Sequence, residues 1–379
     1  MPLTNVQIRP GLNKSDTPSG AEGQWIDSDF VRFRYGQPEK IGGFQAIGQK
    51  TISGPARAQH CWNDLEGRKY SALGTSKALY IYHEDAFYDI TPLRTAITGA
   101  TFTSTSSSST VTVNKTSPAL TVGEYVTFTA VTIPGSSSFV DTDFTSFTFE
   151  ILTTATNSFT ITMQTTETGT PMSGTGSASI NPYEEIGPTI QTYGFGWGTS
   201  TWGTVAYGQG STSTQVILDP GSWSLDNFGQ QLIATVKDGK TFVWNAGAAN
   251  PLTNRATIMT NAPTSSRLTI VSDRDRHVVH FGTETTIGNS TTQDPMFIRF
   301  SDQENFSDYV PTSTNTAGTF RLDTGNKIVA AVSGKDYNLI LTDTAAYVMQ
   351  FVGPPFTFSI RQVGTNCGCI GQHAVVYAD

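Results

Sequence analysis

The stretch QQLIATVKDGKTFVWN (residues 230–245) decides the fold. Its two apolar runs, LIATV and TFVWN, are rich in the β-branched and aromatic residues that favour strands. Between them lies Lys237-Asp238-Gly239, and an Asp-Gly pair between two such runs is a strong hairpin signal. The stretch therefore predicts two antiparallel strands joined by a tight turn.

Similar units occur elsewhere in the chain. Residues 68–93 contain three short apolar segments separated by turn residues, and residues 276–302 and 338–353 each contain a pair. The leading strands lie near Ser71, Ile233, Val278 and Leu339, so the last two steps are 45 and 61 residues. Spacing of this order, with a hairpin in each unit, is typical of a β-propeller.

The composition also favours an all-β protein. Charged residues make up 14% of the 379 residues, and Ser, Thr and Gly replace them. A typical soluble domain has about 25% charged residues, and helices depend on several of them. The 22 Phe, 13 Tyr and 6 Trp exclude a disordered chain, because so many aromatic residues indicate a buried core.

A Ser/Thr-rich stretch interrupts the repeated units. Residues 98–180 contain one basic residue, Lys115, yet alternation persists in STVTVNKT (109–116), EYVTFTAVTI (124–133), FTFEILTT (147–154) and NSFTITMQTT (157–166). A flexible linker would not place Val, Phe and Ile at every second position. We expect a small β-sandwich or β-barrel domain inserted into the propeller.

These observations divide the chain into four parts. Residues 1–50 are predicted to form an extended N-terminal arm with a first strand in DFVRFRYG, and 51–97 the first part of the propeller. Residues 98–186 form the inserted domain, and 187–379 a Gly/aromatic connector followed by the second part of the propeller. Without the insertion, the remaining length predicts about six blades. The final HAVVYAD (373–379) has the pattern of another strand pair, so the propeller is expected to be incomplete in this chain.

The connector has two interpretations. In residues 187–215, glycines alternate with Tyr193, Phe195, Trp197, Trp202 and Tyr207. The rings are buried beneath a neighbouring domain, or they form an exposed stacking surface.

Charge and cysteine content restrict the partners and the compartment. The net charge of −8 argues against tight DNA binding, which depends on Lys and Arg neutralising phosphates. Three cysteines, Cys61, Cys367 and Cys369, give no disulfide framework. The sequence shows neither a signal peptide nor an apolar run long enough to span a bilayer, so we expect synthesis in a cytosol.

Candidate chemical groups favour a structural interpretation. His277 and His280 are three residues apart, so on a strand they face opposite sides and cannot share a metal. In SDRDRH (272–277), two arginines would repel a cation, and Asp–Arg pairing at a blade turn is expected instead. GTNCGCIG (364–371) has His373 nearby but no group to orient it as a base.

One turn is similar to a motif of propeller glycosidases. KDGKTFVW (237–244) is similar to the Asp-box turn of sialidases, but it lacks the leading Ser or Thr and does not recur in the other hairpins. We therefore predict no enzyme and no catalytic, metal-binding or cofactor-binding residue.

Several longer strings resemble one protein family, the β-propeller tail hub or nozzle proteins of short-tailed bacteriophages. This group includes the head-closure proteins called packaged-DNA stabilisation proteins. The strings are DFVRFRYGQPEKIGGFQ (29–45), ALGTSKALYIY (72–82) with DITPL (89–93), WSLDNFGQQLIAT (223–235), APTSSRLTIVSDRDRHVVHFG (262–282), IRFSDQENFSDYVPTSTNTAGTFRL (298–322) and LILTDTAAYVMQFVGPPFTFSIRQVGTNCGCIGQHAVV (339–376). The stretch 262–376 is the most specific part.

The resemblance implies a structural role in the virion tail. Such proteins form a six-fold ring, a homohexamer, below the portal and adaptor, around the channel through which double-stranded DNA leaves. They retain the packaged genome, hold the needle and tailspikes or fibres, and carry no catalytic residues. A low basic content fits a conduit that does not grip DNA.

Two other functions remain open at this stage. One is a peripheral receptor-binding or carbohydrate-binding tail module, in which residues 193–207 stack on sugar rings. The other is a glycosidase that acts on capsule or lipopolysaccharide.

Overall fold

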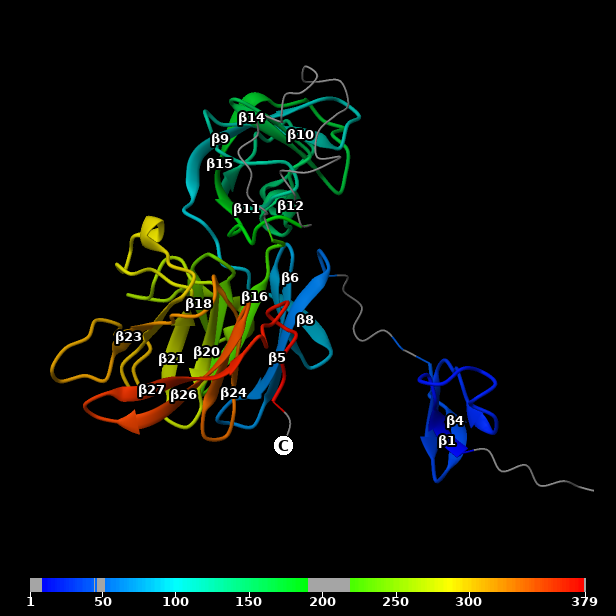
Figure 1. Cartoon of the computed structure of the whole chain (residues 1–379). Coiled ribbons are helices and arrows are strands. Elements are labelled where there is room, and N and C mark those ends of the chain that lie inside the picture. Colours follow the sequence, from blue (N-terminus) through cyan, green and yellow to red (C-terminus); the bar gives the residue numbers. More distant parts are fainter. Residues whose placement is uncertain (1–8, 44, 46–51, 190–218, 378–379) are drawn as a thin grey trace, which may run out of the picture. The chain divides into compact units, whose positions relative to one another are not determined.

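The computed structural model describes residues 9–43, 45, 52–189 and 219–377, and it separates into two units, Met1–Gln49 and Lys50–Asp379 (Figure 1). The first unit contains two small sheets. Strands β1 (Arg9–Leu12) and β2 (Gln24–Trp25) are parallel, and β3 (Val31–Arg34) pairs with β4 (Gln37–Lys40) as an antiparallel hairpin. The strand expected in DFVRFRYG is therefore present as β3.

Four antiparallel sheets of four strands each form the larger part of the second unit, and we number them blades 1 to 4. In each blade the strands follow one another in sequence order. Blade 1 contains β5 (Ala56–Asn63), β6 (Lys69–Thr75), β7 (Leu79–His83) and β8 (Ala86–Asp89). Blade 2 contains β16 (Trp223–Phe228), β17 (Gln231–Val236), β18 (Thr241–Asn245) and β19 (Thr257–Ile258). Blade 3 contains β20 (Leu268–Ser272), β21 (His277–Phe281), β22 (Phe297–Phe300) and β23 (Gly318–Arg321). Blade 4 contains β24 (Ile328–Ser333), β25 (Asn338–Thr342), β26 (Ala345–Gly353) and β27 (Thr357–Thr365).

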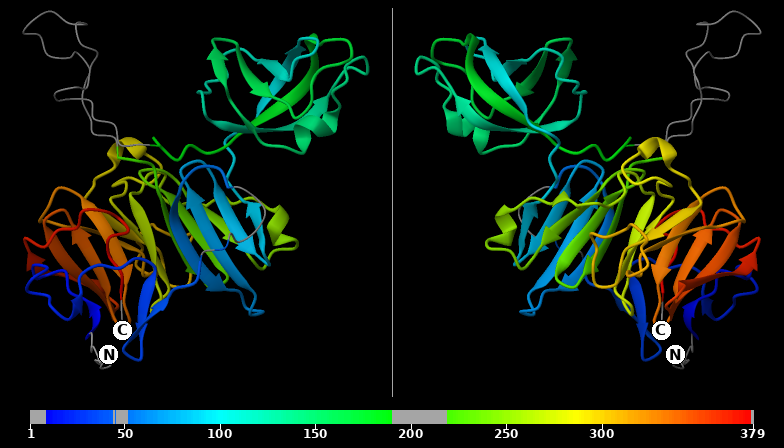
Figure 2. Two further views of the ribbon diagram at one scale, coloured as in Figure 1. Left: turned by 90° about the vertical axis from the view of Figure 1, so that its right-hand side faces the viewer. Right: turned by 90° about the vertical axis from the view of Figure 1, so that its left-hand side faces the viewer.

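The first strands of the blades lie next to one another. Strand β16 contacts β5 and β20, and β20 contacts β24 (Figure 2). Large apolar side chains fill the space between neighbouring blades, including Trp223 and Trp244 between blades 1 and 2, and Phe281 and Met349 between blades 3 and 4. This packing of radially arranged four-stranded sheets is propeller-like, and it confirms the predicted all-β fold class.

The hairpins were located correctly from the sequence, but the number of strands in each unit was predicted too low. Ser71, Ile233, Val278 and Leu339 all lie in the second strand of a blade, because a further strand precedes each predicted hairpin. The described residues contain four blades, fewer than the six or so that the chain length suggested. Strands β1 to β4, which the length estimate counted toward blades, form two-stranded sheets instead.

The predicted strand pair at HAVVYAD (373–379) is wrong for the residues that the structure describes. Residues 373–377 contain no strand. The backbone amides of Cys367 and Cys369 donate instead to the carbonyls of Thr344 and Thr342, at 3.1 and 3.0 Å. These bonds turn the chain back over the β25–β26 turn, so residues 373–377 do not continue as strand.

A seven-stranded sheet lies between blades 1 and 2 in sequence, and Figure 2 shows it curled around its own core. We call it the inserted domain. Its strand order is β12-β11-β15-β9-β10-β14-β13. The strands are β9 (Ile97–Ser104), β10 (Thr110–Asn114), β11 (Tyr125–Thr132), β12 (Phe149–Glu150), β13 (Thr153–Ala155), β14 (Ser158–Thr162) and β15 (Ser173–Pro182), with one short helix, α1 (Asp141–Thr145). Phe102, Phe128, Phe144 and Phe159 occupy the core. FTFEILTT, expected as one strand, is divided into β12 and β13, because β12 pairs with β11 whereas β13 pairs with β14.

Helical structure is scarce in the described residues. Besides α1 there are two 3-10 turns, Pro251–Thr253 and Ser290–Thr292. No helix within the described ranges is long and apolar enough to span a membrane.

Candidate functional site

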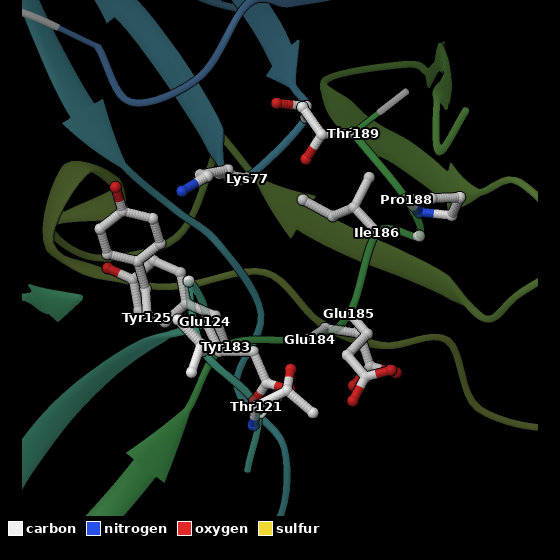
Figure 3. A pocket seen from close by; sticks show the side chains of 14 residues that line it. Lys77, Thr121, Glu124, Tyr125, Tyr183, Glu184, Glu185, Ile186, Pro188 and Thr189 are labelled. Atoms are coloured by element: carbon white, nitrogen blue, oxygen red, sulfur yellow. Dashed lines mark hydrogen bonds between the residues drawn. The ribbon is translucent and has the colours of Figure 1, made fainter. Parts of the chain in front are cut away.

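The junction between the inserted domain and blade 1 concentrates charged and aromatic residues (Figure 3). Two chain segments cross it side by side, one entering and one leaving the inserted domain. Arg94 N donates to the carbonyl of Pro182 at 2.8 Å, and Glu184 N donates to the carbonyl of Pro92 at 2.9 Å. These backbone bonds pair the two segments, so the connection is more rigid than a single linker.

Ion pairs join the two sides of this junction. Lys77 Nζ, in the β6–β7 turn of blade 1, lies 2.8 Å from Glu150 Oε1 of the inserted domain. The Arg94 guanidinium contacts Glu124 and lies 2.8 Å from Glu185 Oε1. Blade 2 contributes Lys240, whose Nζ is 2.9 Å from Glu184. The inserted domain is thus attached by several charge pairs.

A buried tyrosine lies at the centre of the junction. The Tyr183 hydroxyl donates to Asp89 Oδ2 of blade 1 and lies 2.9 Å from the Thr148 hydroxyl. Arg255 of blade 2 approaches both partners, at 3.3 Å from Asp89 and 3.2 Å from the Tyr183 oxygen. Burial and the Asp89 carboxylate raise the pKa of Tyr183 well above its usual range. The hydroxyl therefore stays protonated and acts as a hydrogen-bond donor.

A cavity of about 420 Å³ opens beside these residues. Lys77, Glu124, Tyr125 and Tyr183 line it, and Lys77 Nζ lies 5.0 Å from the centroid of the Tyr125 ring (Figure 3). The charged groups around the cavity form ion pairs with one another. Such pairing is typical of a rigid contact between domains. The arrangement fits attachment of a domain better than acid–base chemistry.

The two candidate histidines lie in separate environments, as their spacing predicts. His280 is fully buried, with Nδ1 3.0 Å from Thr269 Oγ1 and Nε2 3.1 Å from the Tyr309 hydroxyl. Burial, together with the charge of Arg299, lowers the pKa of His280 to about 3. His280 is therefore neutral in the fold and serves as a hydrogen-bonding group of the blade 2–blade 3 core.

His277 is part of a chain of polar groups that has the order of a hydrolytic triad. Its Nδ1 lies 3.0 Å from Asp275 Oδ2, and its Nε2 lies 3.0 Å from the Thr316 hydroxyl. The Thr316 hydroxyl, however, donates to Asp302 Oδ1 at 2.8 Å. A nucleophile needs its proton directed to the base, so Thr316 is held in place rather than activated.

The surroundings of His277 agree with a structural role. Its ring is fully buried and packs against Phe300, Phe351 and Phe358, with centroid distances of 6.3, 5.8 and 5.1 Å. Such packing leaves no approach for a substrate to the imidazole.

The arginines of SDRDRH form ion pairs, but their partners lie outside the motif. Arg274 lies 3.1 Å from Asp336, and Arg276 lies 2.7 Å from Glu304. Asp275 is buried and accepts from Ser272 at 2.5 Å. The pairing expected within the turn is thus replaced by pairing with residues 28 and 62 positions away.

Other sequence candidates stand as follows. Cys61, Cys367 and Cys369 are free cysteines. The Gly/aromatic stretch 193–207 lies outside the described residues. In the part of the chain that the structure covers, no group of three or more His, Cys, Asp or Glu side chains is arranged to hold a metal.

Sequence inspection missed the junction residues Lys77, Arg94, Tyr183 and Arg255. One signal was available in the sequence. Charged residues reappear in Tyr183-Glu184-Glu185, directly after the Ser/Thr-rich stretch, and this change in composition marks a domain boundary.

Comparisons with known proteins give little guidance. No family model and no curated protein matches the chain. Among solved structures, the chain is similar to the Phage phi92 endosialidase, with 13% sequence identity and a TM-score of 0.28. The match covers 88% of this chain and 53% of that one, so the chain spans about half the length of that structure. At this TM-score the likeness identifies no function.

Proposed function

We propose that this chain is a non-enzymatic structural protein of a virion tail, a subunit of the nozzle or hub ring of a short-tailed bacteriophage. One observation carries the proposal: the strings that resemble this family occur in order along the chain, and the most specific one, residues 262–376, coincides with blades 3 and 4. A resemblance that extends over two complete blades is harder to explain by chance than a resemblance of one turn.

In this role the protein joins the portal and adaptor to the distal tail. A homohexameric ring surrounds the path of the DNA, retains the packaged genome and carries the needle and the tailspikes or fibres. A closed ring of head-to-tail contacts requires two different complementary patches on each subunit. The arm formed by residues 1–50 is a suitable source for one of them, as a strand donated to a neighbour or to the adaptor.

The contacts of the buried titratable side chains support a structural role. The buried Asp275, His277 and His280 are all engaged in contacts within the blades. The net charge of −8 gives DNA few cationic partners along its path. Rigid blades and a weakly adhesive surface are what a conduit for DNA requires.

The inserted domain fits a contact with a neighbouring tail protein. Its ion pairs with blades 1 and 2, through Lys77 and Lys240, hold it at a defined place on the propeller. A decorating domain attached in this way presents a fixed surface to a partner.

The proposal is tested by locating the protein in the particle. A short peptide tag is inserted between the exposed turn residues Ser106 and Ser107 of the inserted domain, and tagged particles are imaged with a bound antibody fragment. We expect about six labels arranged around the tail axis, directly below the portal. Labels at the periphery of the tail, or free fibres carrying the tag, would contradict a nozzle.

A second candidate function is carbohydrate binding at the tail periphery. A groove of about 480 Å³ runs along blade 1, lined by Asn63, Lys69, Tyr82, Glu84 and other residues. The Tyr82 hydroxyl donates to Asp85 at 2.7 Å, so an aromatic ring lies beside polar groups, as in sugar sites. Binding to a glycan array that is lost in Tyr82→Ala and retained in Tyr337→Ala would favour this function.

A further inference from the structure

Three cations from three blades meet around one carboxylate. Lys237 follows β17 of blade 2, Arg267 precedes β20 of blade 3, and Lys327 precedes β24 of blade 4. All three point toward Asp219, which lies before β16. They border a cavity of about 460 Å³, whose remaining wall includes Gln372 of the C-terminal segment.

Two of these cations have donors that the protein leaves unused. Lys237 Nζ makes a hydrogen bond to Asp219 Oδ2 at 3.0 Å. The Arg267 guanidinium, by contrast, lies 3.7 Å from Asp219 and 3.5 Å from Asp238, and Lys327 Nζ lies 3.8 Å from Asp219. These separations exceed the length of a good N–H···O bond, about 3.2 Å at most. With respect to the described residues, neither Arg267 nor Lys327 has a hydrogen-bonded acceptor.

The unused donors of Arg267 are partly shielded from water, whereas the Lys327 side chain is 44% exposed. The Arg267 side chain is 16% exposed, and a guanidinium carries five donors in a fixed plane. Neither residue has a nitrogen among the described buried atoms that lack a hydrogen-bond partner, so these donors are accessible to solvent. The donors border the cavity, where a ligand can reach them.

The balance of charge favours an anion. Burial would raise the pKa of Asp219, but the hydrogen bond and charge of Lys237, with Lys327 and Arg267, hold it below its usual value. Asp219 is therefore ionised at neutral pH, and three cations face two carboxylates, Asp219 and Asp238. One positive charge remains without a partner in this group.

We propose that this cavity binds a phosphate-type oxyanion, held by the planar fork of Arg267 and by Lys327. A guanidinium matches two oxygens of such an anion at once, and an ammonium adds a point charge. The oxyanion comes either as a free phosphate compound or as a phosphate of a nucleic-acid backbone. The site does not depend on the proposed virion role, because it follows from contacts within one chain.

The test measures pyrophosphate binding to the full chain by isothermal titration calorimetry at constant ionic strength. We expect binding by the wild-type protein and a loss of about tenfold or more in affinity for Arg267→Gln and for Lys327→Gln. Arg267→Lys keeps the charge but removes the fork, so its affinity should fall between those of wild type and Arg267→Gln. Lys335→Gln, at an exposed lysine in the turn after β24, is the matched control and should bind like wild type.

A short DNA duplex in the same titration separates the two sources. Duplex binding that pyrophosphate displaces, and that Arg267→Gln weakens, assigns the site to a nucleic-acid phosphate. Pyrophosphate binding without duplex binding assigns it to a free phosphate compound. The proposal is overturned if wild type does not bind pyrophosphate, or if Lys327→Gln, at a half-exposed position that tolerates substitution, binds as tightly as wild type while circular dichroism shows it folded.

Discussion

The indole of Trp223 lies directly on the backbone of Gly74: a Cβ atom at residue 74 would lie 2.5 Å from Trp223 Cδ1. Trp223 begins β16 of blade 2 and is fully buried, and its indole nitrogen donates to the carbonyl of Thr75 at 3.0 Å. Gly74 lies in β6 of blade 1, on the other side of the inserted domain in the sequence. The contact therefore joins two blades across the insertion.

Gly74→Ala should destabilise the fold by about 1–3 kcal/mol, because the added methyl group overlaps a large ring in a closely packed core. Chemical denaturation followed by tryptophan fluorescence measures this, since Trp62, Trp223 and Trp244 all belong to the core between blades 1 and 2. The control is Gly371→Ala, where a Cβ would meet no atom within 4 Å. Equal losses in both variants would contradict direct contact between Trp223 and residue 74.

The hairpins were predictable because their signals are local. Lys237-Asp238-Gly239 places Asp238 at a φ of 56°, a backbone conformation that Asp tolerates better than most residues. The first strand of blade 2, β16, was missed because it contains polar residues that resemble a turn. Asp226 and Asn227 of β16 are accommodated by tertiary contacts: Val271 N donates to Asp226 at 2.7 Å, and His60 Nε2 lies 2.8 Å from Asn227. Nothing in the local sequence reveals these partners.

The candidate sites were less predictable than the strands. Arg255 and Asp89, which meet at the junction, are 166 positions apart. Lys237, Arg267 and Lys327 come from three different blades and converge only because the first strands of the blades begin at the same end of the propeller. Each is an ordinary loop residue in the sequence, and its role depends on the packing of the blades.

Glu167 should make the stability of the inserted domain dependent on pH. The carboxylate is fully buried and accepts from the hydroxyls of Ser104, Ser137 and Ser138, at 3.0, 2.6 and 2.8 Å. Burial alone would raise the pKa of Glu167, but these bonds lower it to about 2, from an ordinary value of 4.5. Its contribution is therefore present above pH 4.5 and is lost as the pH falls toward 2.

The measurement is differential scanning calorimetry of Glu167→Gln and wild type from neutral to acidic pH. The variant should lose about 1–3 kcal/mol at neutral pH and show a weaker dependence on pH below 4.5. Glu185→Gln, at an exposed carboxylate paired with Arg94, should keep the wild-type profile. A Glu167→Gln profile that parallels wild type in acid would refute the assignment.

Because of His280, we expect the stability of the blades to fall in acid as well. Its pKa is about 3 in the fold, against an ordinary value of 6.5, so the unfolded chain binds a proton that the folded chain does not. Stability should fall as the pH decreases from 6.5 toward 3, by up to about 1.4 kcal/mol per pH unit. Chemical denaturation of His280→Gln should show a smaller slope over this range. An unchanged slope in His280→Gln would rule the mechanism out.

The hydrogen bond between Tyr183 and Asp89 should couple the inserted domain to blade 1 energetically. Tyr183→Phe removes the donor and Asp89→Asn removes the charge, and Arg255 contacts both partners. A double-mutant cycle by chemical denaturation should give a coupling energy of about 0.5–3 kcal/mol, because the groups share one buried network. Tyr183→Phe combined with Glu185→Gln is the control cycle, since the Glu185 carboxylate pairs with Arg94 and not with Tyr183. Additive losses are expected there. If the Tyr183–Asp89 cycle is additive as well, the inserted domain is held by its ion pairs and by the backbone bonds between the two crossing segments, and the buried tyrosine only fills space at the junction.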